Sequence, residues 1–446
     1  MSERLRLLDS LSYGCLGLPL ALLGLPLYVY LPTYYARDLM LGPATVGGIL
    51  MASRILDVFT DPVAGWISDR LLPGNWRRRG MLIAGAPILL GGIWMLFLPP
   101  DGASSAWLLI GTTLACLGWT LVDIPHAAWI AELSENYYER SLLATTREGF
   151  RVLGVFLTLA LPLATGTSEN LGTVLRQLLI LVMFSLPLAV AIAVLTLSEP
   201  STAFRSPSWI QSVNLLWGNR PLRRLLLAYL LDGLANGLPA TLFLLFTTQR
   251  LAIPEPLPLL LLYFGAGVLG VPLWLKLARK VGKHRAWAVS LALAALSFLP
   301  VPWLGPQQTD LFIVTVALTG LTLGGDMALP VAMQADVVDA DTAAGGGMRA
   351  GLLFGIWSMT TKFALALSVG IAFPLLEIFG YNPKLSYTPD LTLCVLAWLY
   401  AGLPAVLKTI CIGLVWHFPI DAKAQVQARE QIRRLLQSQN EQRRKG

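Results

Sequence analysis

Charged residues are scarce in this chain. Asp, Glu, Lys and Arg make up only 13% of its 446 residues, whereas they make up about 25% of a typical soluble domain. In their place, 55% of the residues are hydrophobic, and apolar runs of about 20 residues, long enough to cross a bilayer, recur along the whole sequence. The composition excludes an ordinary soluble protein and predicts an all-α, multi-pass membrane protein.

Residue types that carry out chemistry are equally sparse. The four cysteines all fall in apolar segments, which favours small buried side chains over a disulfide framework or a metal site. The sequence shows no nucleophile–base set, metal-ligand cluster or phosphate-binding loop, so we expect neither an enzyme nor a cofactor. The net charge of +7 is explained by basic loops between membrane spans and does not indicate nucleic acid as a partner.

The apolar runs predict twelve transmembrane helices. Basic residues gather in alternate loops, and the positive-inside rule therefore places both termini in the cytoplasm. We expect a monomer in a bacterial-type inner membrane, with lipid around it and a solvated, partly disordered basic tail. The predicted spans cover residues 11–34, 43–67, 81–99, 106–131, 148–166, 177–198, 223–248, 256–277, 286–304, 311–335, 350–379 and 391–417.

A polar linker divides the chain into two similar halves. We expect a six-helix bundle at residues 1–198, a cytoplasmic linker at 199–222, a second six-helix bundle at 223–417 and a cytoplasmic tail at 418–446. Asp123-Ile-Pro125 in the fourth span is echoed by Asp326-x-x-x-Pro330 in the tenth. Duplication of a six-helix unit, with inverted repeats, is typical of the major facilitator fold.

Two carboxylates lie inside the second predicted span. Asp57 and Asp61 are four residues apart, so they share one helix face at a separation of about 6 Å. Carboxylates inside the bilayer are costly and mark ion or proton pathways. The alternative is a structural ion pair between Arg54 and Asp57, but one arginine cannot neutralise both carboxylates.

Hydroxyl groups near this pair offer further cation ligands. Small hard cations prefer several oxygen ligands, and Thr60 and Thr120 supply them if the second and fourth helices are adjacent. Lys362 in the eleventh span is the expected compensation for buried carboxylates, or a purely structural counter-ion.

Other intramembrane polar residues are candidates for substrate binding. The alternative to substrate binding is a structural role: Asp123 would then satisfy backbone groups freed by Pro125, and Arg147 would mark the end of its helix. Asn236 and Asp326 alternatively hold helices together, while Lys408 is expected to reach the membrane surface with its long side chain. The full set of substrate candidates is Trp119, Asp123, Arg147, Asn236, Asp326 and Lys362.

These motifs together resemble the glycoside–pentoside–hexuronide:cation symporter family. The resemblance rests on Arg54-Ile-x-Asp57-x-x-x-Asp61-Pro62-x-x-Gly65, on Thr120-x-x-Asp123-Ile-Pro125 and on Lys362, and it runs over the whole chain. It implies the major facilitator fold and a coupling cation, Na⁺ or H⁺, held by Asp57, Asp61 and Thr120. It also implies substrate binding by Asp123 and Arg147, with Lys362 near both sites.

The chain departs from the family pattern in its first span. The adjacent lysine and aspartate expected there are replaced by the apolar stretch at residues 17–22. We therefore expect cation-coupled symport of a small organic solute by alternating access, sugar-like by resemblance. The alternatives are a lysolipid or other amphipathic substrate, as in vertebrate relatives that carry lysophospholipids with sodium, and a membrane receptor or scaffold that no longer transports.

Overall fold

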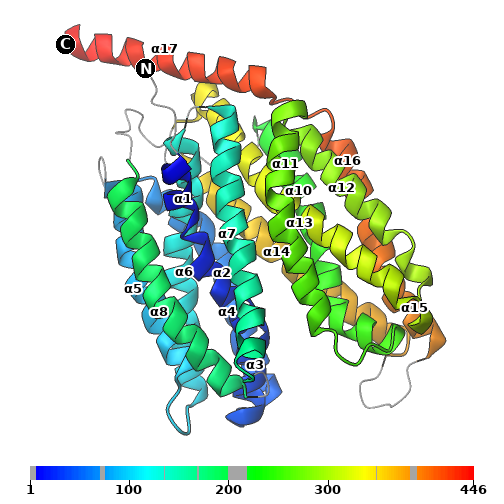
Figure 1. Cartoon of the computed structure of the whole chain (residues 1–446). Coiled ribbons are helices and arrows are strands. Elements are labelled where there is room, and N and C mark those ends of the chain that lie inside the picture. Colours follow the sequence, from blue (N-terminus) through cyan, green and yellow to red (C-terminus); the bar gives the residue numbers. More distant parts are fainter. Residues whose placement is uncertain are drawn as a thin grey trace. The chain divides into compact units, whose positions relative to one another are not determined.

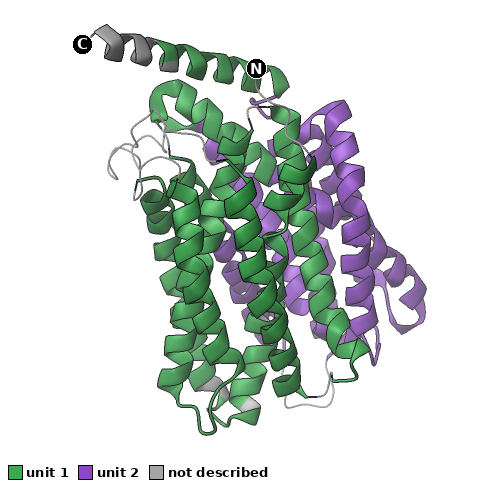
Figure 2. Ribbon diagram, turned by 60° about the vertical axis from the view of Figure 1, so that its left-hand side comes forward, with its two compact units in different colours: residues 1–219, 331–359, 422–446 green, residues 220–330, 360–421 purple. Residues whose placement is uncertain are grey.

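The computed structural model describes the chain apart from residues 1–6, 71–75, 135, 168–169, 199–217, 348, 382–388 and 446. Every regular element in this described part is a helix (Figure 1), which confirms the all-α prediction. Most of the predicted linker, residues 199–217, lies outside the described residues. The described chain forms two compact units, coloured green and purple in Figure 2: unit 1 comprises residues 1–219, 331–359 and 422–446, and unit 2 comprises 220–330 and 360–421.

Unit 1 contains the first six predicted spans. The first span is irregular, with α-helical and π-helical segments in succession. The elements are α1 (Leu7–Gly14), α2 (Gly17–Leu25), η1 (Pro26–Tyr30), α3 (Leu31–Thr33), η2 (Tyr34–Asp38), α4 (Pro43–Ser68), α5 (Arg77–Phe97), α6 (Ser105–Leu133), α7 (Tyr137–Ala164) and α8 (Leu171–Thr196).

Unit 2 contains most of the remaining spans. Two of its helices, α13 and α14, continue into unit 1, because residues 331–359 belong to unit 1. The elements are α10 (Arg220–Leu245), η4 (Phe246–Arg250), α11 (Leu257–Val281), α12 (Lys283–Phe298), η5 (Val301–Trp303), η6 (Pro306–Gln308), α13 (Thr309–Asp341), η7 (Thr342–Gly346), α14 (Ala350–Ile378), α15 (Asp390–Ala397), η8 (Trp398–Gly402) and α16 (Leu403–Val415).

Helical segments cover most of each predicted span, and several of the predicted spans also contain or end in turns and loops. Ten of the described helical segments are long and apolar enough to cross a membrane. The other two predicted spans are α4, with 26 residues, and α7, with 28 residues, and both carry charged side chains of the candidate site. The tail, expected to be partly disordered, instead forms helix α17 (Ala422–Lys445), which belongs to unit 1.

Glycines allow α4 and the first part of α14 to pack backbone against backbone. A Cβ atom added to Gly65 would lie 2.1 Å from the carbonyl oxygen of Gly351, and one added to Gly355 would lie 2.6 Å from the carbonyl oxygen of Asp61. Small residues at helix interfaces permit such close approach inside a membrane. This contact places residues of α14 next to the carboxylates of α4.

Asp69, the residue that follows α4, caps the start of α14. The backbone N–H groups of Gly351 and Leu352 donate to the Asp69 carboxylate at 2.8 and 3.0 Å. These are first-turn N–H groups that have no partner within their own helix. The Asp69 carboxylate also pairs with Arg78 at 2.7 Å, and both side chains are buried. The carboxylate therefore fixes the register of α14 against α4.

We expect Gly65→Ala to destabilise the protein by about 1–3 kcal/mol, the usual cost of an added methyl group in a packed interface. The new Cβ has backbone on its far side, which cannot move aside as a flexible side chain can. Thermal melting of the purified protein measures the effect. Gly48→Ala on the same helix is the matched control, because a Cβ at Gly48 meets nothing within 4 Å. Equal melting temperatures for the two variants would contradict the close-packing account.

Candidate functional site

The two carboxylates of α4 are both buried. Asp57 is 2% exposed and Asp61 is 0% exposed. Their spacing of four residues in a continuous helix places them on one face, as the sequence predicts. Two acidic side chains withdrawn from water require a cation or a proton nearby.

Asp61 is held by hydroxyl groups from two other helices. The Thr120 hydroxyl of α6 donates to Asp61 Oδ1 at 2.8 Å, and the Ser358 hydroxyl of α14 donates to Asp61 Oδ2 at 2.7 Å. The second and fourth spans are thus adjacent, the condition on which the predicted cation site depends. Three helices place oxygen atoms around one carboxylate, which is the ligand chemistry of a small hard cation.

The other residues expected around the pair are placed differently. The Thr60 hydroxyl donates to the backbone carbonyl of Asp57 at 3.4 Å, a bond within its own helix. The side chain of Arg54 lies outside the described residues, so the structural ion pair with Asp57 stays a prediction. Lys362 is partly buried on the part of α14 that belongs to unit 2, and its role as counter-ion also stays a prediction.

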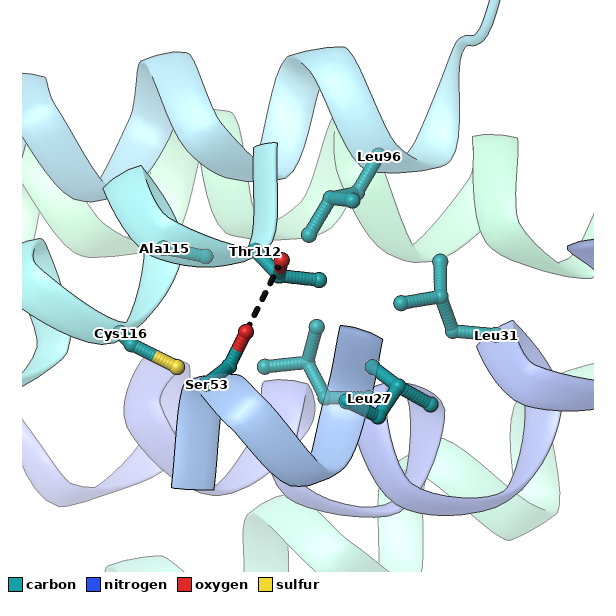
Figure 3. Close-up of a pocket in the computed structure, with 8 residues that line it drawn as sticks. Leu27, Leu31, Ser53, Leu96, Thr112, Ala115 and Cys116 are labelled. Carbon is teal, nitrogen blue, oxygen red and sulfur yellow. Dashed lines mark hydrogen bonds between the residues drawn. The ribbon is translucent and has the colours of Figure 1, made fainter. Parts of the chain in front are cut away.

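A line of small polar side chains continues along α4 and α6. Ser53 precedes Asp57 by four residues, and its hydroxyl donates to Thr112 Oγ1 at 3.1 Å. Figure 3 shows this pair at a small cavity of about 20 Å³, otherwise lined by side chains such as Leu27 and Leu96. A cavity of this size has room for about one water molecule, although most of its lining is apolar. The pair extends the polar face of α4 beyond the carboxylates.

Asp123 lies between two arginines of α7. Arg151 donates to Asp123 Oδ1, and Arg147 reaches the same oxygen at 3.4 Å. The three side chains are 14%, 21% and 4% exposed for Asp123, Arg151 and Arg147 respectively. Arg151 was not expected from the sequence, although it lies one helical turn after Arg147 on the same face.

The two arginines are also close to a second carboxylate. Glu148 Oε1 lies 3.6 Å from Arg147 Nε and 3.6 Å from Arg151 Nη1. With Asp123, the four side chains carry no net charge. Within the described residues, Arg147 Nε and Nη1 have no hydrogen-bond acceptor at standard distance, although the side chain is 4% exposed. Arg147 therefore has two buried donor atoms without an acceptor in this part of the structure.

A reciprocal contact between α1 and α6 holds this region in place. The Tyr13 hydroxyl donates to the His126 carbonyl at 2.9 Å, and His126 Nε2 is 2.8 Å from the Tyr13 carbonyl oxygen. Both residues are fully buried. Because His126 follows Asp123 by three residues on α6, the contact fixes the part of the helix from which Asp123 projects.

The other predicted substrate residues have diverse surroundings. Trp119 is half-buried on α6. In unit 2, Asn236 donates to Asp232 at 3.3 Å, and Asp326 accepts a 2.8 Å bond from Lys408. The expectation that Lys408 reaches the membrane surface is wrong, because its side chain is 1% exposed and its ammonium group binds two carboxylates in the protein interior.

Sequence reasoning missed Ser358, Arg151 and the partners of Lys408. The signal for Arg151 was present, as a charged residue four positions after Arg147 in an apolar span. Ser358 carries no such signal, because its position depends on the close contact of α4 with α14.

Known proteins match this chain over nearly its full length. It is 23% identical to the sodium-dependent lysophosphatidylcholine symporter 1-A of Danio rerio, over 98% of this chain and 91% of that protein. It is 22% identical to a glucuronide carrier protein homolog of Escherichia coli (strain K12), over 89% of this chain and 88% of that protein.

Solved structures show the same fold. A bacterial homologue of the iron transporter ferroportin, in an outward-facing state, matches with a TM-score of 0.65 at 14% identity, covering 92% of this chain and 99% of that one. The major facilitator transporter FucP matches with a TM-score of 0.63 at 13% identity, covering 91% and 97%. The prediction of a major facilitator fold is confirmed.

The family model described as MFS/sugar transport protein matches residues 12–422. That range includes α4, α6, α7 and α14, which carry Asp57, Asp61 and the residues around them. The named relatives are carriers and symporters, and not enzymes. The chain belongs to the MFS/sugar transport family, as a secondary transporter of the glycoside–pentoside–hexuronide:cation symporter type that its sequence resembles.

Proposed function

We propose that the protein couples uptake of a small organic solute to the entry of Na⁺, by alternating access in a bacterial-type inner membrane with both termini in the cytoplasm. The observation that carries the proposal is the environment of Asp61, whose two carboxylate oxygens each accept a hydroxyl hydrogen from a different helix. Asp57 lies one turn away and is equally buried.

The cation site explains how ion binding and conformation are linked. A bound cation neutralises buried carboxylates and draws together oxygen atoms of α4, α6 and α14. Without the cation, the repulsion of Asp57 and Asp61 disfavours that arrangement. Binding therefore stabilises one conformation over another, and the shift in population equals the difference in affinity between them.

We favour Na⁺ over H⁺, because the hydroxyl groups that donate to Asp61 stabilise its ionised form, and their oxygens can complete the ligand set of a metal cation. We expect NaCl to raise the melting temperature of the purified protein relative to choline chloride, by the equivalent of about 2.7 kcal/mol at 100 times the dissociation constant. Uptake into proteoliposomes under an imposed Na⁺ gradient gives the second measurement. If a pH gradient alone drives uptake and Na⁺ gives no stabilisation, H⁺ is the coupling ion.

The substrate end of the proposal rests on Asp123, Arg147 and Arg151. Arg147 has donors without acceptors among the described residues, and Asp123 is partly exposed. Such a pair suits a solute with a polar end that bears hydroxyl or carboxylate oxygens, as in a sugar or a uronate. The glucuronide carrier homolog among the relatives supports this class.

The lysophosphatidylcholine symporters among the relatives favour a second candidate, an amphipathic lysolipid. Its phosphate would take the same arginine donors, and the apolar stretch at residues 17–22 would face its chain. Calorimetric titration with sugars, uronates and lysophosphatidylcholine side by side separates the two classes.

Arg151→Gln should weaken binding of the identified solute about 10- to 100-fold, since a hydrogen bond to a charged group contributes about 1.5–3 kcal/mol. Arg176→Gln on α8 is the matched control, because Arg176 is exposed. Unchanged affinity in the Arg151 variant would remove this residue from the proposed site.

A further inference from the structure

A second group of charged side chains lies in unit 2 and includes Asp326, one of the predicted substrate residues. The Lys408 ammonium nitrogen of α16 is 2.8 Å from Asp232 Oδ1 of α10 and 2.8 Å from Asp326 Oδ2 of α13. The three side chains are 1%, 2% and 4% exposed respectively. We call Asp232, Asp326 and Lys408 the unit 2 triad.

The charges of the unit 2 triad do not balance if all three groups are ionised. Two carboxylates face one ammonium group, which leaves one negative charge in the protein interior. Tyr263 of α11 and Cys411 of α16 also interact with the triad, and both side chains are neutral at ordinary pH. Asn236 and Ser290, which also contact it, are uncharged. A buried, uncompensated charge costs several kcal/mol, so one carboxylate is expected to bind a proton.

Hydrogen-bond geometry around Ser290 favours Asp326 as the carboxylate that binds this proton. The Ser290 hydroxyl oxygen is 2.9 Å from Asp326 Oδ1 and 3.1 Å from the carbonyl oxygen of Thr322. A hydroxyl group has one hydrogen and donates to only one of these two acceptors. A proton on Asp326 Oδ1 resolves the conflict, because Asp326 then donates to Ser290 while Ser290 donates to Thr322.

The other carboxylate has no such conflict. Asp232 Oδ1 accepts from the Lys408 ammonium group, and Asp232 Oδ2 accepts from the Asn236 amide at 3.3 Å. Both of its oxygens therefore face donors, which suits the ionised form. Asp232 and Lys408 form a neutral ion pair, and Asp326 Oδ2 accepts a further bond from Lys408 as a neutral acid.

We propose that the unit 2 triad is a proton-binding site that holds one exchangeable proton on Asp326 Oδ1, separate from the cation site at Asp57 and Asp61. The proton makes the triad neutral and completes the hydrogen-bond chain from Asp326 through Ser290 to Thr322. Because the triad joins α10, α13 and α16, its deprotonation at alkaline pH leaves a net negative charge among three helices and weakens their packing. The site stands whether or not the proposed Na⁺ coupling is correct.

Infrared spectroscopy of the purified protein in lipid, with the spectra of wild type and variant compared, tests whether Asp326 is protonated. The wild type should show the carbonyl stretch of a protonated carboxylic acid at neutral pH, and Asp326→Asn should lack that band. The asparagine is a close mimic of the neutral acid, since its amide can donate to Ser290 and accept from Lys408, so the variant should remain folded. Asp310→Asn, an exposed position on the same helix, is the matched control and should keep the band. An unchanged acid band in Asp326→Asn would overturn the proposal.

Two further variants test the charge count and the geometry. In Asp232→Asn the remaining carboxylate is needed to balance Lys408, so the acid band should also disappear. In Ser290→Ala the protonated Asp326 side chain loses its hydrogen-bond acceptor, so the acid band should persist at a shifted frequency. The wild type should lose thermal stability as the pH is raised from neutral to alkaline, and Asp326→Asn should not show this loss. Persistence of the acid band in Asp232→Asn, or a parallel alkaline loss of stability in Asp326→Asn, would contradict the proposal.

Discussion

Asp61→Asn should abolish cation-driven accumulation of the substrate while the protein remains folded. The substitution removes the negative charge that attracts the cation, and it weakens cation affinity by about 10- to 100-fold for each charged contact of 1.5–3 kcal/mol. An asparagine at this position still accepts from one of the two hydroxyl groups and donates to the other, so the link between α4, α6 and α14 is retained. The variant therefore removes the charge of Asp61 while keeping the hydrogen bonds that link the three helices.

Uptake by proteoliposomes under an imposed Na⁺ or pH gradient measures the effect. Asp101→Asn is the matched control, since Asp101 is an exposed residue outside the membrane helices. This variant should accumulate substrate as the wild type does. Calorimetric binding of substrate without a gradient should persist in Asp61→Asn. Undiminished accumulation would show that Asp61 does not bind the coupling ion.

The parts of the site that lie along one helix could be predicted from sequence. Helical periodicity alone places Asp57 and Asp61 on one face, and the composition of their span identifies them as buried. The ten helical segments that are long and apolar enough to cross a membrane follow in the same way from apolar run lengths. For these features, local spacing determines the structure.

Contacts between distant helices could not be predicted in this way. Ser358 reaches Asp61 across 297 residues, and only the glycine contact of α4 with α14 makes that possible. Lys408 shows the same limit. Its place near the end of a span suggested access to the membrane surface, but its partners Asp232 and Asp326 lie 176 and 82 residues away in the sequence. The sequence of one helix shows that it carries a charge, but it does not show which other helix neutralises that charge.

The largest loss of stability is expected from Arg140→Ala, at the end of unit 1 that is predicted to face the cytoplasm. Arg140 is fully buried, and its guanidinium group contacts α13 and the C-terminal end of α6. It pairs with Asp339 of α13 at 2.6 Å and donates to the carbonyl oxygens of Ala131 at 2.6 Å and Ser134 at 2.8 Å. Removing one partner of a buried ion pair costs about 3–5 kcal/mol, because the other charge is left without compensation.

Arg429 of α17 provides a matched comparison, because it contacts the same three groups. It pairs with Asp339 at 2.6 Å and donates to the Ala131 carbonyl at 2.8 Å, but its side chain is 16% exposed where that of Arg140 is 0% exposed. Water can replace part of what Arg429→Ala removes, so that variant should lose about 1 kcal/mol or less. Thermal melting of both purified variants decides the matter. Equal losses would mean that Asp339 depends on the tail helix as much as on α7, and that burial does not set the strength of this ion pair.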